Sequence, residues 1–348
     1  MDLIEPRSRE EVATAIRDAA KGRRRLLPVG GRTHLARGEP TEIDAELWTV
    51  SLHRLVAYEP AEMIAVVEAG RRVGELSRIV GDGGQEWAVD APEDATVGGV
   101  IASGVSSPRR LRVGPVRDTV LEVELVTGEG RPVRGGGRTV KNVTGFDLPR
   151  LMTGSLGTLG ILVQVALKLR PLPAARRTLV LEGSIETAQR ALAQVPLPAA
   201  ILATRSHVEI LLEGWPEAVD EQTGRARTLG EMHVVEDAEF PNNSPWSRHP
   251  VVVEASVPPG RLRELADVAG EDWGALAGVG TFWAGLPSAN GELSSLRARV
   301  SEVGGVAPVI RGPGGLGSVP EAERIHRRLK ATFDPAGVLA PGRFWGGI

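Results

Sequence analysis

The sequence predicts an α+β protein built from two domains. Its 348 residues exceed what a single compact core usually accommodates. Apolar residues make up 42% and charged residues 24% of the chain, a composition typical of a globular protein. Short apolar or alternating runs, which indicate strands, are interspersed with longer runs of helical spacing, and no internal repeat is apparent. We therefore expect strands and helices to be mixed within each domain.

The first domain is predicted to open with a helix over residues 8–20. Ser8 and Glu11 form a capping box, and apolar residues follow them at helical spacing. The next segments read as strand, strand and helix, over residues 24–31, 63–70 and 73–80.

A glycine-studded helix, a hairpin and a long strand complete this domain. They are predicted over residues 96–107, 119–134 and 160–173, and prolines at 171 and 173 end the strand. A linker is expected at "RPLPAARR", residues 170–177.

The second domain is predicted to be a mixture of strands and helices. "RTLVLEG", "SHVEILLEG" and "HPVVVEASV" read as strands, whereas "SIETAQRALAQV" and "RLRELADVAG" read as helices. The chain ends with a basic helix, "EAERIHRRLKATF", and a turn. We therefore expect domains over residues 1–172 and 175–318, and a C-terminal segment, 319–348, that packs back on the first domain.

Composition excludes several classes of function. The formal net charge of −3 provides no general attraction to nucleic acids or anionic membranes. The absence of cysteine excludes disulfides and cysteine-ligated iron–sulfur clusters within this chain. The scattered acidic residues predict no metal site. Neither an apolar run long enough for a membrane span nor a signal peptide is apparent, so we expect a cytoplasmic protein.

Two glycine-rich stretches have the character of ligand-binding loops. "PVGGRTH", residues 28–34, ends a predicted strand and would present consecutive amide N–H groups, which bind phosphate. In "ATVGGVIASG", Thr96 would cap the helix, and Gly98 and Gly99 would admit a flat or charged group at its start. The alternatives are an ordinary tight turn and close packing of the helix on a sheet.

A third glycine cluster lies within "GFDLPRLMTGSLGTLGILVQVALKLRPLP", residues 145–173. Gly154, Gly157 and Gly160 precede the long strand. They indicate either a ligand approached closely by backbone or a loop that needs positive φ angles.

Two familiar nucleotide-binding signatures do not apply. No G-x-x-x-x-G-K occurs, so a P-loop is excluded. "GPGGLG", residues 312–317, matches G-x-G-x-x-G, but Pro308 interrupts the strand-like stretch before it and Pro313 sits inside the loop. Only 31 residues follow it in the 348-residue chain, and one βαβ unit alone takes about 30.

The ordered motifs resemble the FAD-binding domain of the vanillyl-alcohol oxidase/para-cresol methylhydroxylase (PCMH) family. They run "ATVGGVIASGVSSPRR", "GPVRDTVLEVELVTGEG" and "VKNVTGFDLPRLMTGSLGTLGILVQVALKLRPLP". The ending "LKATFDPAGVLAPGRF" is similar to the family's closing motif, with Ala340 in place of the usual Asn. Within the family, the chain looks most like the E-type subunit of bacterial glycolate oxidases. The resemblance implies a two-subdomain PCMH-type FAD-binding domain followed by a smaller cap-like domain.

The resemblance also implies which residues bind FAD. The first glycine loop would take the pyrophosphate, and Leu156 replaces a frequent acidic residue of the third loop. Some relatives link FAD to a histidine in the first loop. In this chain the position that matches that histidine is nearer Arg32, and His34 is displaced from it. We therefore expect non-covalent FAD. The implied cofactor-binding residues are Pro28, Val29, Gly30, Gly31, Arg32, Thr33, His34, Pro92, Ala95, Thr96, Val97, Gly98, Gly99, Ala102, Ser103, Arg117, Asp118, Gly157, Thr158, Gly160, Ile161 and Val163.

Catalytic residues are harder to assign. Oxidising a 2-hydroxy acid requires a base for the hydroxyl proton and a cation for the carboxylate. The six histidines form no H-x-x-H or H-H pair, and Tyr58 is the only tyrosine. Arg109, Arg112 and Arg311 are weak candidates for the cation, the alternative being solvated loop residues.

The resemblance implies the FAD-binding subunit of a glycolate-oxidase-type complex. It would oxidise glycolate to glyoxylate together with a catalytic flavoprotein subunit and an iron–sulfur subunit, either free in the cytoplasm or peripheral to the inner membrane through those partners. Two alternatives remain open: a non-catalytic flavin-carrying scaffold or electron relay, and a stand-alone FAD-dependent oxidase of an alcohol or hydroxy acid.

Overall fold

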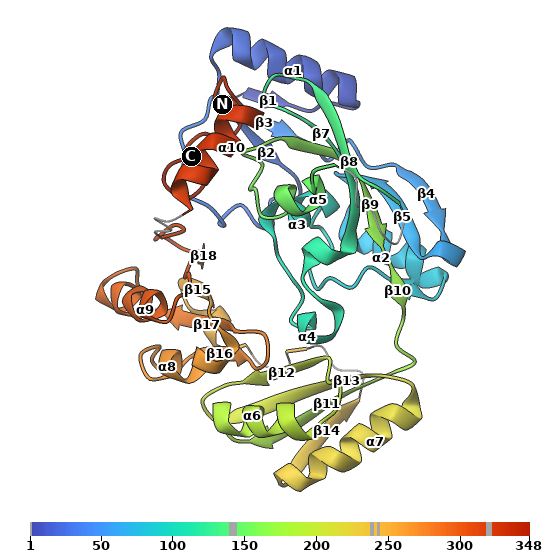
Figure 1. Ribbon diagram of the computed structural model, residues 1–348, viewed down its shortest axis with the longest axis vertical. Coiled ribbons are helices and arrows are strands. Elements are labelled where there is room, and N and C mark those ends of the chain that lie inside the picture. Colours follow the sequence, from blue (N-terminus) through green and yellow to red (C-terminus); the bar gives the residue numbers. More distant parts are fainter. Residues whose placement is uncertain (1, 139–144, 237–239, 242–243, 318–321) are drawn as a thin grey trace. The chain divides into compact units, whose positions relative to one another are not determined.

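The computed structural model describes residues 2–138, 145–236, 240–241, 244–317 and 322–348 (Figure 1). The chain divides into two compact units. Unit 1 comprises Met1–Ser107, Pro115–Leu172 and Ser318–Ile348, and unit 2 comprises Pro108–Gly114 and Pro173–Gly317. The units differ from the predicted domains at residues 108–114, which group with unit 2. The predicted boundary at residues 318 and 319 touches a segment outside the described residues.

Unit 1 begins with a small parallel sheet and the predicted first helix. The strand order is β1-β3-β2, with β1 at Asp2–Ile4, β2 at Leu26–Val29 and β3 at Ala45–Trp48. Helix α1 spans Arg9–Gly22, and the Ser8 side chain accepts a hydrogen bond from the Glu11 amide at 3.2 Å, as the capping motif predicts. Val12 and Ile16 of α1 are fully buried in one cluster with Leu26 and Leu47. This packing fixes the position of β2, whose last residue, Val29, directly precedes the first glycine loop.

The second sheet of unit 1 is antiparallel, in the order β4-β5-β9-β7-β8. The predicted hairpin is present as β7 and β8, and the long predicted strand, β9, lies between β5 and β7. The strands are β4 Leu55–Glu59, β5 Ile64–Glu68, β7 Val120–Val126, β8 Pro132–Gly136 and β9 Ile161–Lys168. The helices of this part are α2 Val73–Asp82, α3 Val97–Ser103 and α5 Leu148–Met152.

The predicted linker at residues 170–177 is mostly strand. Arg170–Pro171 forms β10 and pairs with β6, Gln85–Glu86, while β11 already begins at Ala175. The change from unit 1 to unit 2, between Leu172 and Pro173, lies inside the predicted linker. Strand was not predicted at its ends, and Pro171 is tolerated there because its missing N–H is not needed at the edge of a two-stranded ribbon.

Unit 2 is one eight-stranded sheet made of two βαββαβ halves (Figure 1). The first half has the strand order β14-β11-β13-β12 and the second has β16-β17-β15-β18, so each has its fourth strand beside its first. The halves meet where β12 pairs with β16. Unit 2 therefore contains a structural repeat, although its sequence shows none. Packing requires the same order of elements in both halves, but it does not require the same residues at equivalent positions.

The elements of unit 2 follow the predicted alternation of strands and helices. The first half consists of β11 Ala175–Glu182, α6 Ile185–Gln194, β12 Ala200–Ala203, β13 His207–Gly214, α7 Pro216–Ala226 and β14 Met232–Glu236. The second consists of β15 Val251–Ser256, α8 Leu262–Ala266, β16 Trp273–Leu276, β17 Thr281–Leu286, α9 Gly291–Glu302 and β18 Val309–Arg311. Single 3₁₀ turns occur in unit 2 at Arg227–Leu229, Pro245–Arg248 (η4) and Pro259–Arg261, and in unit 1 at Pro60–Glu62 and Val116–Thr119.

One face of the unit 2 sheet packs against helices. Alternate strand residues on that face, such as Ile210, Val253 and Phe282, form a large core with α6, α7, α8 and α9. The residues between them point to the other face, because side chains alternate along a strand. We call this second surface the far face; several of its residues, such as Leu211 and Glu213, are fully buried.

The segment 108–114 carries a short helix, α4 Arg110–Val113. The Arg109 side chain is 5% exposed, and its Nη1 lies 3.1 Å from the Oε1 of the fully buried Glu213 on β13. Arg176 of β11 donates to the same oxygen at 2.7 Å. A buried charge requires a partner, so this cluster explains why the segment groups with unit 2.

Unit 1 ends with the predicted basic helix, α10 Glu323–Phe333, followed by a turn. The buried carboxylate of Asp334 accepts the amides of Val338 and Leu339 at 3.0 and 2.8 Å, which shapes that turn. Among the residues that the structure describes, no helix is long and apolar enough to cross a membrane.

Candidate functional site

The first glycine loop presents unbonded amides. The backbone N–H groups of Gly31, Arg32 and Thr33 donate to no group among the described residues. Arg32 has a φ of +60°, in the left-handed region. Consecutive free amides around such a residue form a concave anion site, called a nest. The consecutive unbonded amides that the sequence predicts are therefore present at the end of β2.

The two glycines of this loop are needed for close packing. A Cβ on Gly30 would lie 2.0 Å from Thr96 Oγ1, and one on Gly31 would lie 2.1 Å from the Asp94 oxygen. No larger residue fits at either position. The absence of side chains therefore brings the loop against the residues that precede α3.

The start of α3 is capped by the protein itself. Thr96 Oγ1 accepts the Gly99 amide at 3.2 Å, as the sequence predicts. The amides of Val97 and Gly98 donate to the carbonyls of Arg71 and Ala69. These three N–H groups are therefore not available to a phosphate, unlike those of the first loop.

Gly98 and Gly99 have different roles. A Cβ on Gly98 would lie 2.8 Å from the Cβ of Ala69, so Gly98 allows α3 to pack beside β5. A Cβ on Gly99 would meet only the Thr96 hydroxyl within 4 Å. Packing is the explanation for Gly98, whereas Gly99 lines a cavity together with the first loop.

The third glycine loop rests on the C-terminal end of α3. The amides of Gly154 and Leu156 donate to the carbonyls of Ile101 and Ala102 at 3.0 and 2.8 Å. Gly154 and Gly157 have φ angles of +80° and +76°, and Leu156 has +54°. A Cβ on Gly157 would lie 3.0 Å from Pro28. The glycines here permit positive φ and a close approach to the first loop.

Arg343, in the C-terminal turn, brings a cation to the same place. It is 7% exposed, and its Nη2 donates to the carbonyls of Leu35 and Arg37, both at 2.8 Å. It has no carboxylate partner among the described residues, and burial lowers the pKa of its guanidinium. A buried arginine without a counter-ion favours an anionic ligand.

Arg32 is already engaged by protein groups. Its Nη2 lies 2.6 Å from Glu46 Oε1, and its guanidinium lies 5.2 Å from the centre of the Trp48 ring. The backbone of Arg32 therefore contributes to the nest, while its side chain is held away by Glu46 and Trp48.

These elements surround one depression, which we call the loop hollow. Nine of the predicted cofactor residues line it: Pro28, Gly30, Gly31, Arg32, Thr33, His34, Gly99, Ala102 and Ser103. Leu35, Leu156 and Arg343 also line it and were not among the predicted residues. Arg343 lies in the recognised closing motif, "PGR", which was the one available signal for it.

The other predicted cofactor residues do not line the hollow. Val29, Ala95, Val97, Ile161 and Val163 belong to the buried core, and Thr96 caps α3. Arg117 and Asp118 are about half exposed, and Asp118 pairs with Arg150 at 3.2 Å. The remaining residues, Pro92, Gly98, Gly157, Thr158 and Gly160, lie outside it as well.

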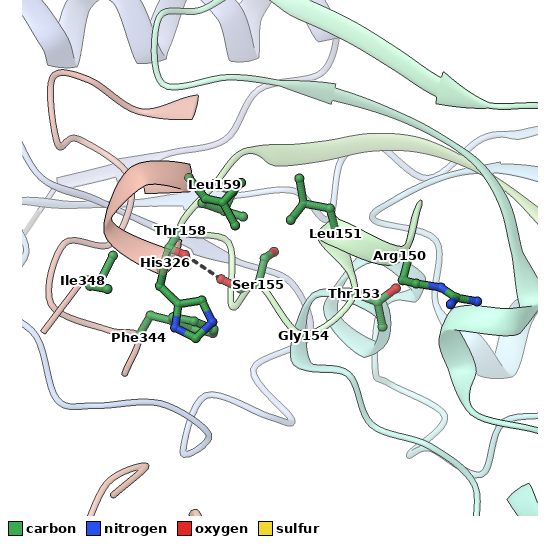
Figure 2. A pocket seen from close by; sticks show the side chains of 11 residues that line it. Arg150, Leu151, Thr153, Gly154, Ser155, Thr158, Leu159, His326, Phe344 and Ile348 are labelled. Atoms are coloured by element: carbon green, nitrogen blue, oxygen red, sulfur yellow. Dashed lines mark hydrogen bonds between the residues drawn. The ribbon is translucent and has the colours of Figure 1, made fainter. Parts of the chain in front are cut away.

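A second cavity adjoins the hollow (Figure 2). Its volume is about 220 Å³. Ser155 and Phe344 line this cavity, whereas the adjacent residues in the sequence, Leu156 and Arg343, line the hollow. The cavity and the hollow are therefore bordered by the same two stretches of backbone. Leu151, Leu159, Leu329 and Ile348 supply apolar walls.

His326 provides a polar group in this cavity. Figure 2 shows its ring beside Phe344, and the ring centres lie 4.9 Å apart at an interplanar angle of 77°. Its buried Nδ1 has no hydrogen-bond partner among the described residues. Burial lowers the pKa of this imidazole, which favours the neutral ring.

The three candidate arginines all lie in unit 2 and bond protein groups. Arg109 pairs with Glu213 in the buried cluster described above. Arg112 Nη1 donates to the Leu197 carbonyl at 2.8 Å, and Arg311 Nη1 donates to the Ser247 carbonyl at 2.5 Å. Arg109 therefore anchors α4, whereas Arg311 remains exposed at the edge of the sheet.

The loop hollow fits the diphosphate of a dinucleotide. It is lined by free amides, by the buried Arg343 and by Gly99, which has no side chain. The neighbouring cavity has apolar and aromatic walls, which suit a planar ring.

Comparison with known proteins identifies the family of this chain. The family described as "FAD binding domain" matches residues 3–136. The glycolate oxidase subunit GlcE of Escherichia coli is 30% identical, in an alignment that spans 97% of this chain and 96% of that protein. A D-lactate dehydrogenase of Archaeoglobus fulgidus is 26% identical over 98% of this chain and 90% of its own length.

Two further similarities concern part of the chain and the fold. The glycolate oxidase subunit GlcD of Bacillus subtilis is 31% identical over 58% of this chain and 44% of that protein. The solved structure of an alkyldihydroxyacetonephosphate synthase superposes with a TM-score of 0.71 at 17% identity, covering 97% of this chain and 75% of that one.

Proposed function

Because this chain belongs to the FAD-binding oxidoreductase family that includes the Escherichia coli glycolate oxidase subunit GlcE, we propose that it is the FAD-binding subunit of a 2-hydroxy-acid dehydrogenase complex. FAD is the cofactor of the family, and the chain is a FAD-dependent oxidoreductase. The substrate, the partner subunits and the placement of FAD are the parts of the proposal that require experiment.

The observation that carries the placement of FAD is the nest at the end of β2. Three consecutive free amides, at residues 31–33, face the same hollow as the buried Arg343. A diphosphate would accept hydrogen bonds from the amides and balance the charge of the guanidinium. We place the pyrophosphate there, with the rest of the extended cofactor continuing along α3 and into the adjoining cavity.

Bound FAD would supply the two-electron acceptor for oxidation of the substrate alcohol. The protein residues around the hollow would position it: Gly99 and Ala102 allow close approach, and the Gly154–Gly157 loop covers the end of α3. His34 lines the hollow, and its Nδ1 lies 2.8 Å from Thr33 Oγ1. We propose that FAD is bound without a covalent link.

The proposed substrate is glycolate or a similar small 2-hydroxy acid. The basis is similarity to proteins named glycolate oxidase subunits and D-lactate dehydrogenase. The first two are named as subunits, which supports a complex with a second flavoprotein subunit. An iron–sulfur subunit is proposed as the outlet for electrons, because this chain has no cysteine with which to bind a cluster.

The first test is the visible spectrum of the purified full chain before and after denaturation with acid. We expect a yellow protein that releases its colour into the supernatant. Colour that stays with the precipitated chain would contradict the non-covalent proposal, and His34→Ala would then show whether His34 carries the link.

A pair of variants tests the location. Ala102→Phe would place a phenyl ring in the hollow, so we expect loss of bound FAD with the fold retained. Ala193→Phe makes the same change at an exposed position of α6 and should leave FAD content unchanged. Equal FAD content in the two variants would contradict the placement of the pyrophosphate.

Substrate and partners are tested on the yellow protein. Glycolate, D-lactate and D-2-hydroxyglutarate are offered with a dye acceptor, alone and after co-expression with candidate partner subunits. Turnover by the isolated chain would indicate a stand-alone enzyme. Turnover only with partners supports the complex, and none under either condition favours a flavin-carrying scaffold.

A further inference from the structure

A cluster of aromatic and charged side chains occupies the far face of unit 2 at η4. Two glycines make room for it. A Cβ on Gly274 of β16 would lie 2.1 Å from the Trp246 ring, and one on Gly285 of β17 would lie 2.4 Å from the His249 ring. Both rings therefore occupy space on the sheet that a side chain at these positions would fill.

Trp246 and Trp283 form a stacked pair in this cluster. Their ring centres are 5.4 Å apart with an interplanar angle of 8°. The Trp283 Nε1 donates to Glu254 Oε2 at 3.0 Å, which fixes its orientation. Trp246 is nearly buried, whereas Trp283 is partly exposed. An apolar indole surface is thus held in a fixed orientation at the far face.

His249 is oriented by a carboxylate. Its Nε2 lies 2.7 Å from Asp272 Oδ2, and its side chain is 25% exposed. An ionised carboxylate can only accept hydrogen bonds, so Nε2 donates the proton of this contact, and Nδ1 is the ring nitrogen left to accept a hydrogen bond from a ligand. Nδ1 has no hydrogen-bond partner among the described residues.

Arg311 adds a cation at the same end of the sheet. It follows Ile310 on β18, and its Nη1 donates to the carbonyl of Ser247. Ser247 precedes His249 by two residues, so their Cα atoms are at most about 7 Å apart. One donor of the guanidinium is used, and its Nε and Nη2 edge makes no hydrogen bond within the described part of the chain. That edge suits a carboxylate.

We propose that this cluster is a binding site for a small 2-hydroxy acid. The carboxylate pairs with the free edge of Arg311, the 2-hydroxyl donates to His249 Nδ1, and the carbon chain contacts the Trp283 ring. The choice of ligand class rests on the proposed function. The site itself rests on the glycines, the histidine–carboxylate pair and the arginine. His249 and Arg311 are the proton acceptor and the cation that such a substrate requires.

The test measures binding by calorimetry on the full chain, with and without FAD. Glycolate is the probe, acetate lacks the hydroxyl, and 1,2-ethanediol lacks the carboxylate. We expect glycolate to bind about 3–10-fold more tightly than acetate, which corresponds to one hydrogen bond, and 1,2-ethanediol not to bind. Quenching of tryptophan fluorescence should accompany binding and diminish in Trp283→Phe.

Three variants separate the contributions. Arg311→Gln should weaken the binding of both glycolate and acetate by roughly 10–100-fold. Asp272→Asn preserves the shape of the pair but allows the amide to donate to Nε2, which moves the ring proton to Nδ1. We therefore expect this variant to retain acetate affinity and lose the preference for glycolate. His249→Gln should lose the same preference.

Matched controls lie elsewhere in unit 2. His207 is also held by a carboxylate, with Nε2 3.3 Å from Glu209 Oε1, and Arg205 is an exposed arginine paired with Glu271. His207→Gln and Arg205→Gln should bind both acids as the natural chain does. Thermal unfolding of every variant establishes that it is folded.

Absence of glycolate binding, equal affinity for glycolate and acetate, or an unaffected Arg311→Gln would each overturn the site. A colourless chain that binds glycolate through Arg311 would contradict the proposed function while leaving this site intact. A yellow chain that binds no acid would contradict only the site. The two failures are therefore distinguishable.

Discussion

Replacement of Lys330 by methionine should strongly destabilise unit 1. The Lys330 side chain is 12% exposed, and its Nζ donates to Asp334 Oδ2 at 2.7 Å. It also donates to the carbonyls of Thr158 and Leu339 at 2.9 and 2.6 Å. Asp334 is fully buried. Lys330 thus joins α10, the C-terminal turn and the third glycine loop.

The magnitude follows from what remains after the substitution. Methionine retains most of the volume, so packing changes little, but the carboxylate of Asp334 stays buried without its cation. Removal of one partner of a buried ion pair costs about 3–5 kcal/mol. With an m-value of about 3 kcal/mol/M in urea, the unfolding midpoint of unit 1 should fall by about 1–1.7 M.

The same helix offers a matched control. Arg327 pairs with Glu323 at 2.7 Å, but the two side chains are 57% and 42% exposed. Arg327→Met should cost about 0–1 kcal/mol, because exposed pairs contribute little. Urea unfolding of the two variants would be followed by circular dichroism together with release of FAD fluorescence. If Lys330→Met shifted the midpoint no more than Arg327→Met, the assignment of a structural clasp to Lys330 would be refuted.

Three further predictions concern acid stability, the buried cluster and two glycines. Burial lowers the pKa of His326 below its ordinary 6.5, so its contribution to stability is present above pH 6.5 and is lost as the pH falls through the lowered value; His326→Phe should flatten the dependence of Tm on pH between about 7 and 5. Arg109→Met should destabilise unit 2 by about 3 kcal/mol, near the lower limit for a buried pair because Arg176 still pairs with Glu213; urea unfolding followed by tryptophan fluorescence checks this, and an unchanged midpoint would contradict it. Gly31→Ala should lower Tm and FAD content, because its Cβ would meet a backbone oxygen at 2.1 Å. Gly81→Ala, in α2 with open space around it, should instead raise stability by about 0.5–1 kcal/mol, and the same sign for both glycines would refute the argument.

Local sequence patterns determined much of the FAD-binding domain. The caps at Ser8 and Thr96 are recognisable because their hydrogen bonds join residues three apart, at 3.2 Å in both cases. The hairpin of β7 and β8 is visible for the same reason, since its turn and alternating strands are contiguous. The motif order also predicted the family, the cofactor and the first glycine loop, because loop residues that approach a phosphate must lack side chains or expose amides.

What tertiary structure decided is which residues of these motifs line the loop hollow. The motifs place Ile161 and Val163 beside the cofactor, yet both are core residues, whereas Leu156 and Arg343 line the hollow. The face to which a side chain points depends on the elements packed on each side, which the motif itself does not contain.

Contacts between residues far apart in the sequence could not be predicted for a related reason. Arg109 is 104 residues from Glu213, and Asp272 is 23 residues from His249. The charged residues gave no local sign of these partners, because charge pairing needs only proximity and imposes no spacing along the chain. The two βαββαβ halves of unit 2 were hidden likewise, since equivalent strands need similar burial but not similar residues. The sequence by itself therefore determined the family and the local turns, and only the packed structure decided which side chains meet.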